Sequence, residues 1–356
     1  MFTMVIAVHL VMVCRVRNFW EMVAVWPDNP AYLDIATVIR NWHFSGGEMP
    51  PHFWGFPYAI ACISRLLSIP GLMALVMLSI LGSLTACQLV HQLYGGWVAT
   101  VFVFINYEWT ILSVEGGAEP LFMCLLLASF LAARSSRWNL AALLASLCTT
   151  VRPLGAFALL CFAIVLARRK SYRQLAIITL IGLAIGVLYV VPLWIILGSP
   201  FANFTGYQPD WGPHGWPLTF PFGALVPAYL TAFFAGTRWY TLLFLATWPV
   251  LALAGTVRIW LPSNQPGFAA MYQPEALFVT LYTLFFLSYN YIGIAWYFSR
   301  FLIPVLPLLV YSLRDCIPRD RRVLWGAAGV SALLSAAALV TFKNVFGFGL
   351  PYGHFK

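Results

Sequence analysis

Long apolar runs, separated by short polar turns, recur along almost the whole chain. A helix that crosses a bilayer needs roughly 20 apolar residues, and fewer where protein surrounds its ends. By this rule the sequence predicts about eleven spans, so we expect an all-α polytopic membrane protein with a bundle of transmembrane helices. The expected spans are Phe2–Cys14, Gly71–Val90, Gly96–Ser113, Pro120–Ala133, Trp138–Thr150, Leu154–Ala167, Leu175–Leu197, Trp239–Val257, Pro274–Trp296, Phe301–Leu313 and Val323–Phe342.

Composition supports this prediction and excludes other classes. Hydrophobic residues make up 62% of the 356 residues and charged residues only 9%, with a mean hydropathy of +0.84. A soluble protein of this length could not bury so much apolar surface. The net charge of +9 comes mainly from basic residues between apolar segments, so we expect no nucleic-acid partner. No linker, repeat or low-complexity tract divides the sequence, which predicts one transmembrane domain over residues 1–356.

Two longer polar connections interrupt the apolar pattern. Residues 15–70 are expected to form the first external loop, with a short amphipathic helix over Ala31–Phe44. The apolar run Tyr58–Leu67 contains Arg65, which favours an interfacial helix that lies against the membrane. Residues 198–238 form the second long loop.

Basic residues gather in three short connections between the expected spans. Cytoplasmic connections carry an excess of Lys and Arg, so we place these three inside and the two long loops outside. This orientation predicts a multi-pass membrane protein with its functional site on the external face. The three connections are residues 134–137, 168–173 and 314–322.

The most informative polar stretch is residues 26–34, which carries two carboxylates and two prolines in an otherwise apolar chain. Asp28 precedes Pro30 and can therefore be the N-cap of a short helix, since Asp is favoured at the N-cap and Pro in the first turn. Asp28 can also be a catalytic base, and neither role excludes the other. Asp34 falls on the polar side of the same helix, where solvation is the simpler interpretation.

A second acidic pair, Glu115 and Glu119, flanks two glycines and is followed by Pro120. The glycines favour a tight, exposed turn, and the proline favours the start of the next helix. Both acids can be solvated loop residues. Alternatively, Glu119 faces the same cavity as Asp28.

Two arginines lie near the expected outer interface. The chain must reverse between the first two basic connections, and Pro153 favours a break beside Arg152. A cation at this depth is costly unless it is solvated or paired with an anion. Arg152 and Arg300 can anchor headgroups by snorkelling. The other interpretation is that they bind a lipid phosphate, which the guanidinium fork suits geometrically.

The second long loop contains an aromatic, glycine- and proline-rich segment, residues 207–217, that includes Trp211 and His214. It can form an interfacial aromatic belt or a lid that stacks on a sugar. The chain has no P-loop, GxSxG, HExxH or DxD motif, and its seven Cys show no CxxC or Cys/His ligand spacing. Nucleotide hydrolysis, serine hydrolysis and zinc chemistry therefore have no support, and no metal site is predicted.

Several short motifs follow one another along the chain: Asp28-x-x-x-Tyr32-x-x-x-Ala36, Gly55-Phe56-Pro57, Glu119-Pro120-Leu121-Phe122, Val151-Arg152-Pro153-Leu154-Gly155 and Arg300-Phe301-x-x-Pro304-x-x-Pro307. In their order and loop placement the chain resembles the GT-C fold glycosyltransferases, polytopic enzymes that use polyprenyl-phosphate sugars. It looks most like bacterial mannosyltransferase-like members related to GPI mannosyltransferase II and to protein or lipid A glycosyltransferases. Several members carry paired acids where this chain has Asp28-Asn29.

This resemblance implies transfer of a sugar, such as mannose, from a polyprenyl-phosphate donor to an acceptor hydroxyl on a glycan, lipid or protein, with inversion. Asp28 would be the general base, and Arg152 or Arg300 would stabilise the leaving phosphate. No resident cofactor is implied, and the absence of paired acids at Asp28 leaves the use of a divalent metal open. The residues that would contact substrate are Glu119, Tyr32, Asp34, Trp211 and His214.

Two other classes fit the same composition. A transporter or lipid flippase would also be polytopic, but transporters usually show inverted repeats and polar or broken helices at the membrane midplane. Here the expected spans are nearly uncharged at their centres, and the polar residues gather on one external face. A non-catalytic scaffold subunit that has kept the fold is the third alternative.

Overall fold

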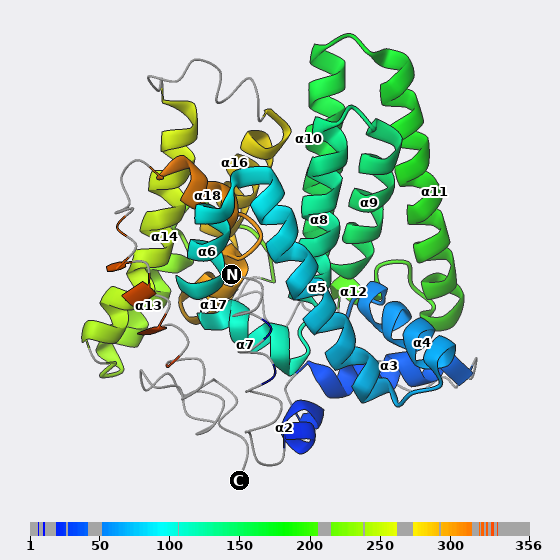
Figure 1. The fold of residues 1–356 in the computed structure, drawn as a ribbon, viewed down its shortest axis with the longest axis horizontal. Helices are drawn as coiled ribbons and strands as arrows, with labels where there is room; N and C mark the ends of the chain where they lie inside the picture. The colour runs from blue at the N-terminus through cyan, green and yellow to red at the C-terminus, as the bar shows by residue number, and fades with distance from the viewer. Residues whose placement is uncertain are drawn as a thin grey trace. The chain divides into compact units, whose positions relative to one another are not determined.

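The structure, a computed structural model, describes residues 6, 10, 19–25, 28–41, 52–105, 107–205, 215–237, 239–261, 273–291, 293–314, 320, 322, 323, 325, 326, 329, 330 and 333. These residues form helices and turns (Figure 1), and the one strand-like pairing among them is an isolated bridge between Leu218 and Tyr289. The predicted all-α class is therefore confirmed for the described part of the chain.

The contacts within the chain define two compact units, which we describe separately. Unit 1 consists of Met1–Leu93 and Leu112–Tyr207, and unit 2 of Tyr94–Ile111 and Gln208–Lys356. The single transmembrane domain expected over residues 1–356 stays a prediction. The helices wholly or mainly in unit 1 are α2 (Phe19–Val25), α3 (Asn29–Asn41), α4 (Gly55–Leu67), α5 (Gly71–Tyr94), α8 (Glu119–Arg134), α9 (Trp138–Val151), α10 (Ala156–Arg168), α11 (Tyr172–Leu197) and α12 (Ala202–Thr205).

Four helices of unit 1, α8 to α11, lie side by side and reverse direction at each connection (Figure 1). The break between α9 and α10 falls at Arg152, whose backbone is extended (φ −146°, ψ 133°), and a 3-10 turn over Pro153–Gly155 follows it. Proline lacks a backbone donor and disfavours helix in the residue before it. The predicted break near Arg152 and Pro153 is confirmed.

The first long loop contains the two expected short helices, α3 and α4, which both begin earlier in the chain than predicted, and also α2, which was not predicted. α3 and α4 pack against each other, because each is amphipathic and turns its apolar side toward the other. Arg40 Nη1 donates a hydrogen bond to Ser64 Oγ at 2.9 Å, which ties the end of α3 to α4. α4 ends at Ser68, which takes the left-handed conformation (φ 54°).

Unit 2 is also helical, and its elements depart from the expected spans. Expected span Gly96–Ser113 is found as two helices, and the second long loop contains the apolar helix α13, which was not predicted. The helices that lie in unit 2, or cross into it, are α6 (Gly96–Ile105), α7 (Tyr107–Glu115), α13 (Leu225–Phe234), α14 (Trp239–Trp260), α16 (Gln273–Ser288), α17 (Ile294–Leu302) and α18 (Leu306–Ser312).

The last described helices correct two further span boundaries. The span expected over Pro274–Trp296 ends at Ser288, and the span expected over Phe301–Leu313 begins only at Leu306. α17 lies between them and ends just before Pro304. Proline opposes continuation of a helix. A prediction that only counts apolar residues therefore misses the break at Pro304.

Two described helices are long and apolar enough to cross a membrane: α5, with 24 residues, and α11, with 26. The other apolar helical segments that this count includes are 10–17 residues long, so the expected number of about eleven spans is not confirmed. α11 is also exposed, because only 6% of its apolar window is buried. Such a surface suits an apolar environment better than water.

We predict that Gly55→Ala lowers the thermal unfolding midpoint of the detergent-purified protein. A Cβ on Gly55 would lie 2.5 Å from the Thr150 carbonyl carbon, and this backbone cannot swing aside as a side chain could. The overpacking should cost about 1–3 kcal/mol.

Gly186→Ala is the matched control, because a Cβ on Gly186 would meet nothing within 4 Å. Alanine favours a helix over glycine by up to about 1 kcal/mol, so this midpoint should stay or rise slightly. Equal midpoints for the two variants would contradict the close approach of α4 to the end of α9.

Candidate functional site

Asp28 lies at the start of α3, as the sequence predicts. Its backbone carbonyl accepts the amide of Tyr32 at 3.1 Å, the first bond of the helix. Its carboxylate remains partly accessible, with 27% of the side chain exposed, and Oδ1 lies 3.6 Å from His52 Nε2. Asp28 therefore combines the helix-start position with a reachable carboxylate, and the two interpretations of this residue remain compatible.

His52 is the functional candidate that sequence reasoning missed. It precedes α4, and its ring lies edge-on to Tyr32, with 5.1 Å between ring centroids. Tyr32 also packs against Phe56, at 5.2 Å, so an aromatic stack from α3 and α4 holds the imidazole beside Asp28. Nothing in the local sequence marks His52, because its partners come from a different helix.

A buried asparagine links the start of α3 to the acidic turn before α8. The Asn29 side chain is buried and donates to the Val23 carbonyl at 2.8 Å. Gly116 has φ +99°, and a Cβ there would overlap Leu75 and lie 3.2 Å from Asn29 Nδ2. Only glycine fits this turn easily. The Asp28 segment and the Gly116–Glu119 turn are therefore neighbours.

Glu119 and Arg152 form an ion pair, with 2.5 Å between Glu119 Oε1 and Arg152 Nη2. The Glu119 side chain is only 2% exposed, whereas that of Arg152 is 23% exposed. The sequence predicted that Arg152 needs solvation or an anion at its depth, and Glu119 supplies the anion. The two residues, expected to orient substrate and to bind phosphate separately, act as one paired unit.

The start of α4 is fixed against α9, α11 and α12. Gly55 lies against the backbone of Thr150, two residues before Arg152. The Trp54 amide donates to the Tyr189 hydroxyl at 3.0 Å, and the buried Asn203 amide donates to the same hydroxyl at 2.9 Å. These bonds hold the segment that carries His52 at the same end of unit 1 as the α9–α10 break.

Tyr58 lies one turn into α4 and extends this aromatic surface. Its ring centroid is 6.1 Å from that of Trp54. Burial raises the pKa of the Tyr58 phenol above its ordinary value, because removal from water disfavours the charged form. The phenol is therefore neutral at physiological pH and remains able to donate a hydrogen bond.

The other predicted site residues lie elsewhere on α3, in unit 2 or outside the described residues. Asp34 is exposed on α3, in accord with a solvated residue, and its contact with substrate stays a prediction. Arg300 lies in α17 of unit 2, beside Phe301, which stacks on Phe286 at 4.8 Å. Trp211 and His214 lie outside the residues that the structure describes.

Two further facts bear on this cluster. Among the described residues, no group of three or more His, Cys, Asp or Glu side chains could hold a metal ion. The segment 207–217 is described only from Gly215, where Asn290 Nδ2 donates to the Trp216 carbonyl at 3.0 Å and Trp216 itself is exposed. The sugar-stacking lid stays a prediction, and the use of a divalent metal stays open.

Comparison with known proteins adds no assignment. No protein-family model matches the chain, and no solved structure matches it. Inferences about function therefore come from the side chains of unit 1 themselves.

We predict that Arg152→Gln destabilises the protein by about 3 kcal/mol, because removing one partner leaves a buried, uncompensated charge on Glu119. Adding Glu119→Gln should recover a large part of this loss, since the double variant buries no charge. Thermal unfolding of the two single variants and the double variant gives the coupling between the sites. If the effects of the two substitutions simply add, the ion pair does not contribute to folding.

Proposed function

We propose that this protein is a membrane glycosyltransferase of the GT-C type. It would transfer a sugar from a polyprenyl-phosphate donor to an acceptor hydroxyl at the external face of the membrane. The sugar, such as mannose or another hexose or pentose, would be transferred with inversion. The acceptor would be a glycan, a lipid or a protein.

One observation carries this proposal: two pairs of ionisable groups converge at one end of an apolar helical unit. Asp28 and His52 form one pair, and Glu119 and Arg152 form the other. The contact of Asn29 with Gly116 joins the segments that bear them. Ionisable groups gathered in an otherwise apolar protein are more often functional than structural.

The geometry suits general-base catalysis by Asp28. Its carboxylate is partly exposed and can accept the proton of the acceptor hydroxyl, while the oxygen attacks the anomeric carbon of the donor sugar. The bond from that carbon to the phosphate oxygen breaks, and the electron pair leaves with the polyprenyl phosphate. His52, 3.6 Å from Asp28, would position the carboxylate for this step.

Arg152 would stabilise the leaving phosphate, whose negative charge grows in the transition state. Its side chain is 23% exposed, so an anion can approach it. Glu119 fixes the guanidinium at the break between two helices, and a fixed cation costs no reorganisation when the reaction occurs. Arg300 is a second candidate for the same role, because its sequence motif matches the family pattern.

The membrane setting supports a lipid-linked donor. α5 and α11 are long enough to cross a bilayer, and the finer prediction of about eleven spans remains part of this proposal. A polyprenyl tail would lie between helices in the hydrocarbon, which leaves its phosphate at interface depth. Arg152, at a break between two apolar helices, is at a suitable position for that phosphate.

We expect Asp28→Asn to reduce sugar transfer by a factor of about 10²–10⁴, the usual contribution of a general base. The variant keeps the size of the side chain and its position at the start of α3, so the fold and the affinity for the donor should change little. The assay is transfer from a radiolabelled polyprenyl-phosphate sugar to extracted acceptors by the reconstituted protein.

Asp34→Asn is the matched control, because it removes the same charge from an exposed position on the same helix. It should transfer at nearly the wild-type rate. Wild-type rates for Asp28→Asn would refute the assignment of the base, and equal losses in both variants would indicate a general charge effect.

Arg152→Lys tests the phosphate role without removing the charge that compensates Glu119. Lysine loses the planar fork of donors, so donor affinity should fall by roughly tenfold while the protein remains folded. Equilibrium binding of the radiolabelled donor to the purified variant measures this. If the affinity for the donor were unchanged, Arg152 would only neutralise Glu119 and would not bind the donor phosphate.

A further inference from the structure

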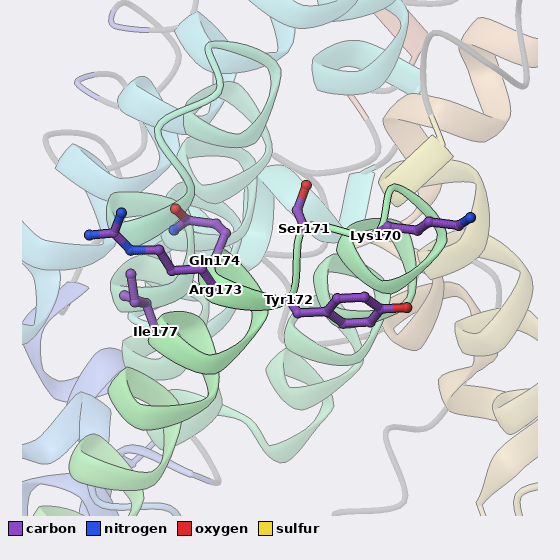
Figure 2. Close-up of a pocket in the computed structure, with 6 residues that line it drawn as sticks. All are labelled: Lys170, Ser171, Tyr172, Arg173, Gln174 and Ile177. Atoms are coloured by element: carbon purple, nitrogen blue, oxygen red, sulfur yellow. The ribbon is translucent and has the colours of Figure 1, made fainter.

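We infer that the turn between α10 and α11 is a binding site for the headgroup of an anionic phospholipid. The structure has an open pocket of about 420 Å³ at this turn, lined by Lys170, Ser171, Tyr172, Arg173, Gln174 and Ile177. Figure 2 shows these side chains spread around the start of α11, with Lys170 and Tyr172 on one side and Arg173 and Gln174 on the other. The site lies at the other end of the α8–α11 bundle from Glu119 and Arg152.

Every charged side chain of the α8–α9 and α10–α11 turns is basic. Arg168, Arg169, Lys170 and Arg173 are all exposed, and Arg137 is exposed on the neighbouring α8–α9 turn. The sequence has no Asp or Glu between Glu119 and Asp210, so no acid of these four helices beyond Glu119 can neutralise them. Clusters of four or more cations beside an apolar span are typical of sites that recognise anionic lipids.

Contacts between the turn and its neighbours hold the pocket in place. Gln174 Nε2 donates to Asn139 Oδ1 at 2.5 Å, which joins the start of α11 to the start of α9. The Arg169 guanidinium lies over the Trp138 ring, 5.7 Å from its centroid. Both basic turns are therefore held together in one surface.

The apolar side of α11 continues directly from the pocket. Exposed apolar residues follow Arg173 along α11 at helical spacing. Leu180 and Val187 lie seven and fourteen residues after it, and their side chains are 64% and 57% exposed. Ile177, which lines the pocket, lies between Arg173 and this stripe. Positions three, four and seven residues apart share one face of a helix.

The basic pocket and the exposed apolar stripe of α11 lie next to each other, which favours a lipid over a soluble anion as the ligand. The cations on both sides of the start of α11 would attract an anionic headgroup to the pocket, while acyl chains would cover the apolar stripe of α11, which nothing covers within the described part of the chain. A free phosphate would use the cations alone and leave the stripe uncovered. The inference depends on the membrane location proposed above but not on the transferase chemistry.

The test measures binding of three probes to the detergent-purified full chain, without donor: dihexanoyl phosphatidylglycerol, dihexanoyl phosphatidylcholine and glycerol 3-phosphate. Phosphatidylglycerol should bind the wild type at least roughly tenfold more tightly than either other probe. Lys170→Gln with Arg173→Gln should weaken this binding by roughly tenfold or more, since each cation near an anionic headgroup contributes to its attraction.

The matched control is Arg65→Gln with Arg258→Gln, which removes two positive charges outside the pocket and should leave the affinity unchanged. Equal losses in the two double variants would overturn the inference, because binding would then follow net charge. Equal affinity for glycerol 3-phosphate and phosphatidylglycerol would also overturn it, since the site would recognise phosphate without lipid. Because no sugar transfer is measured, failure here leaves the proposed transferase activity untouched.

Discussion

The arrangement of unit 1 depends on neutralising one buried carboxylate. Glu119 opens α8 almost completely out of solvent, and a charge in such a place is tolerated only if a partner of opposite sign meets it. Arg152 can do so only because α9 stops at that position and the backbone turns extended before Pro153. The ion pair and the helix break therefore require each other. The position of the helix break at Arg152 therefore fixes where the start of α8 lies against the end of α9.

Close backbone approaches carry this constraint to the neighbouring helices. A Cβ on Gly82 would lie 2.9 Å from the Pro120 carbonyl carbon, so α5 meets α8 immediately after Glu119. Ser79 Oγ donates to the Gly117 carbonyl at 3.2 Å and supports the turn that leads into Glu119. Gly116, in the same turn, contacts Asn29 beside Asp28. Residues far apart in sequence reach the site because small side chains let the helices approach closely.

The sequence predicted those features that depend on local chemistry. The helical class, the break at Pro153, the helix that begins beside Asp28 and the need of Arg152 for an anion all follow from residues within a few positions of one another. The partner of Arg152 is 33 residues away, and the Tyr189 hydroxyl that receives the Trp54 amide is 135 residues away. No local pattern identifies such pairs. The start of α18 was predicted wrongly for another reason: hydropathy counts apolar residues but does not weigh Pro304, which separates α17 from α18.

α8 shows how the two ends of the bundle acquire different chemistry. Its 16 residues span about 24 Å. Glu119 at its start pairs with Arg152, and Arg134 at its end donates to the Leu93 carbonyl at 2.8 Å. An acid at the start and a base at the end also agree with the helix dipole. The only acid of these four helices, Glu119, therefore lies at one end of the bundle, and their exposed cations lie at the other. In the proposed membrane location, these four helices would present an ion pair toward one side of the bilayer and exposed cations toward the other, so the proposed chemistry and the proposed lipid binding could be changed independently.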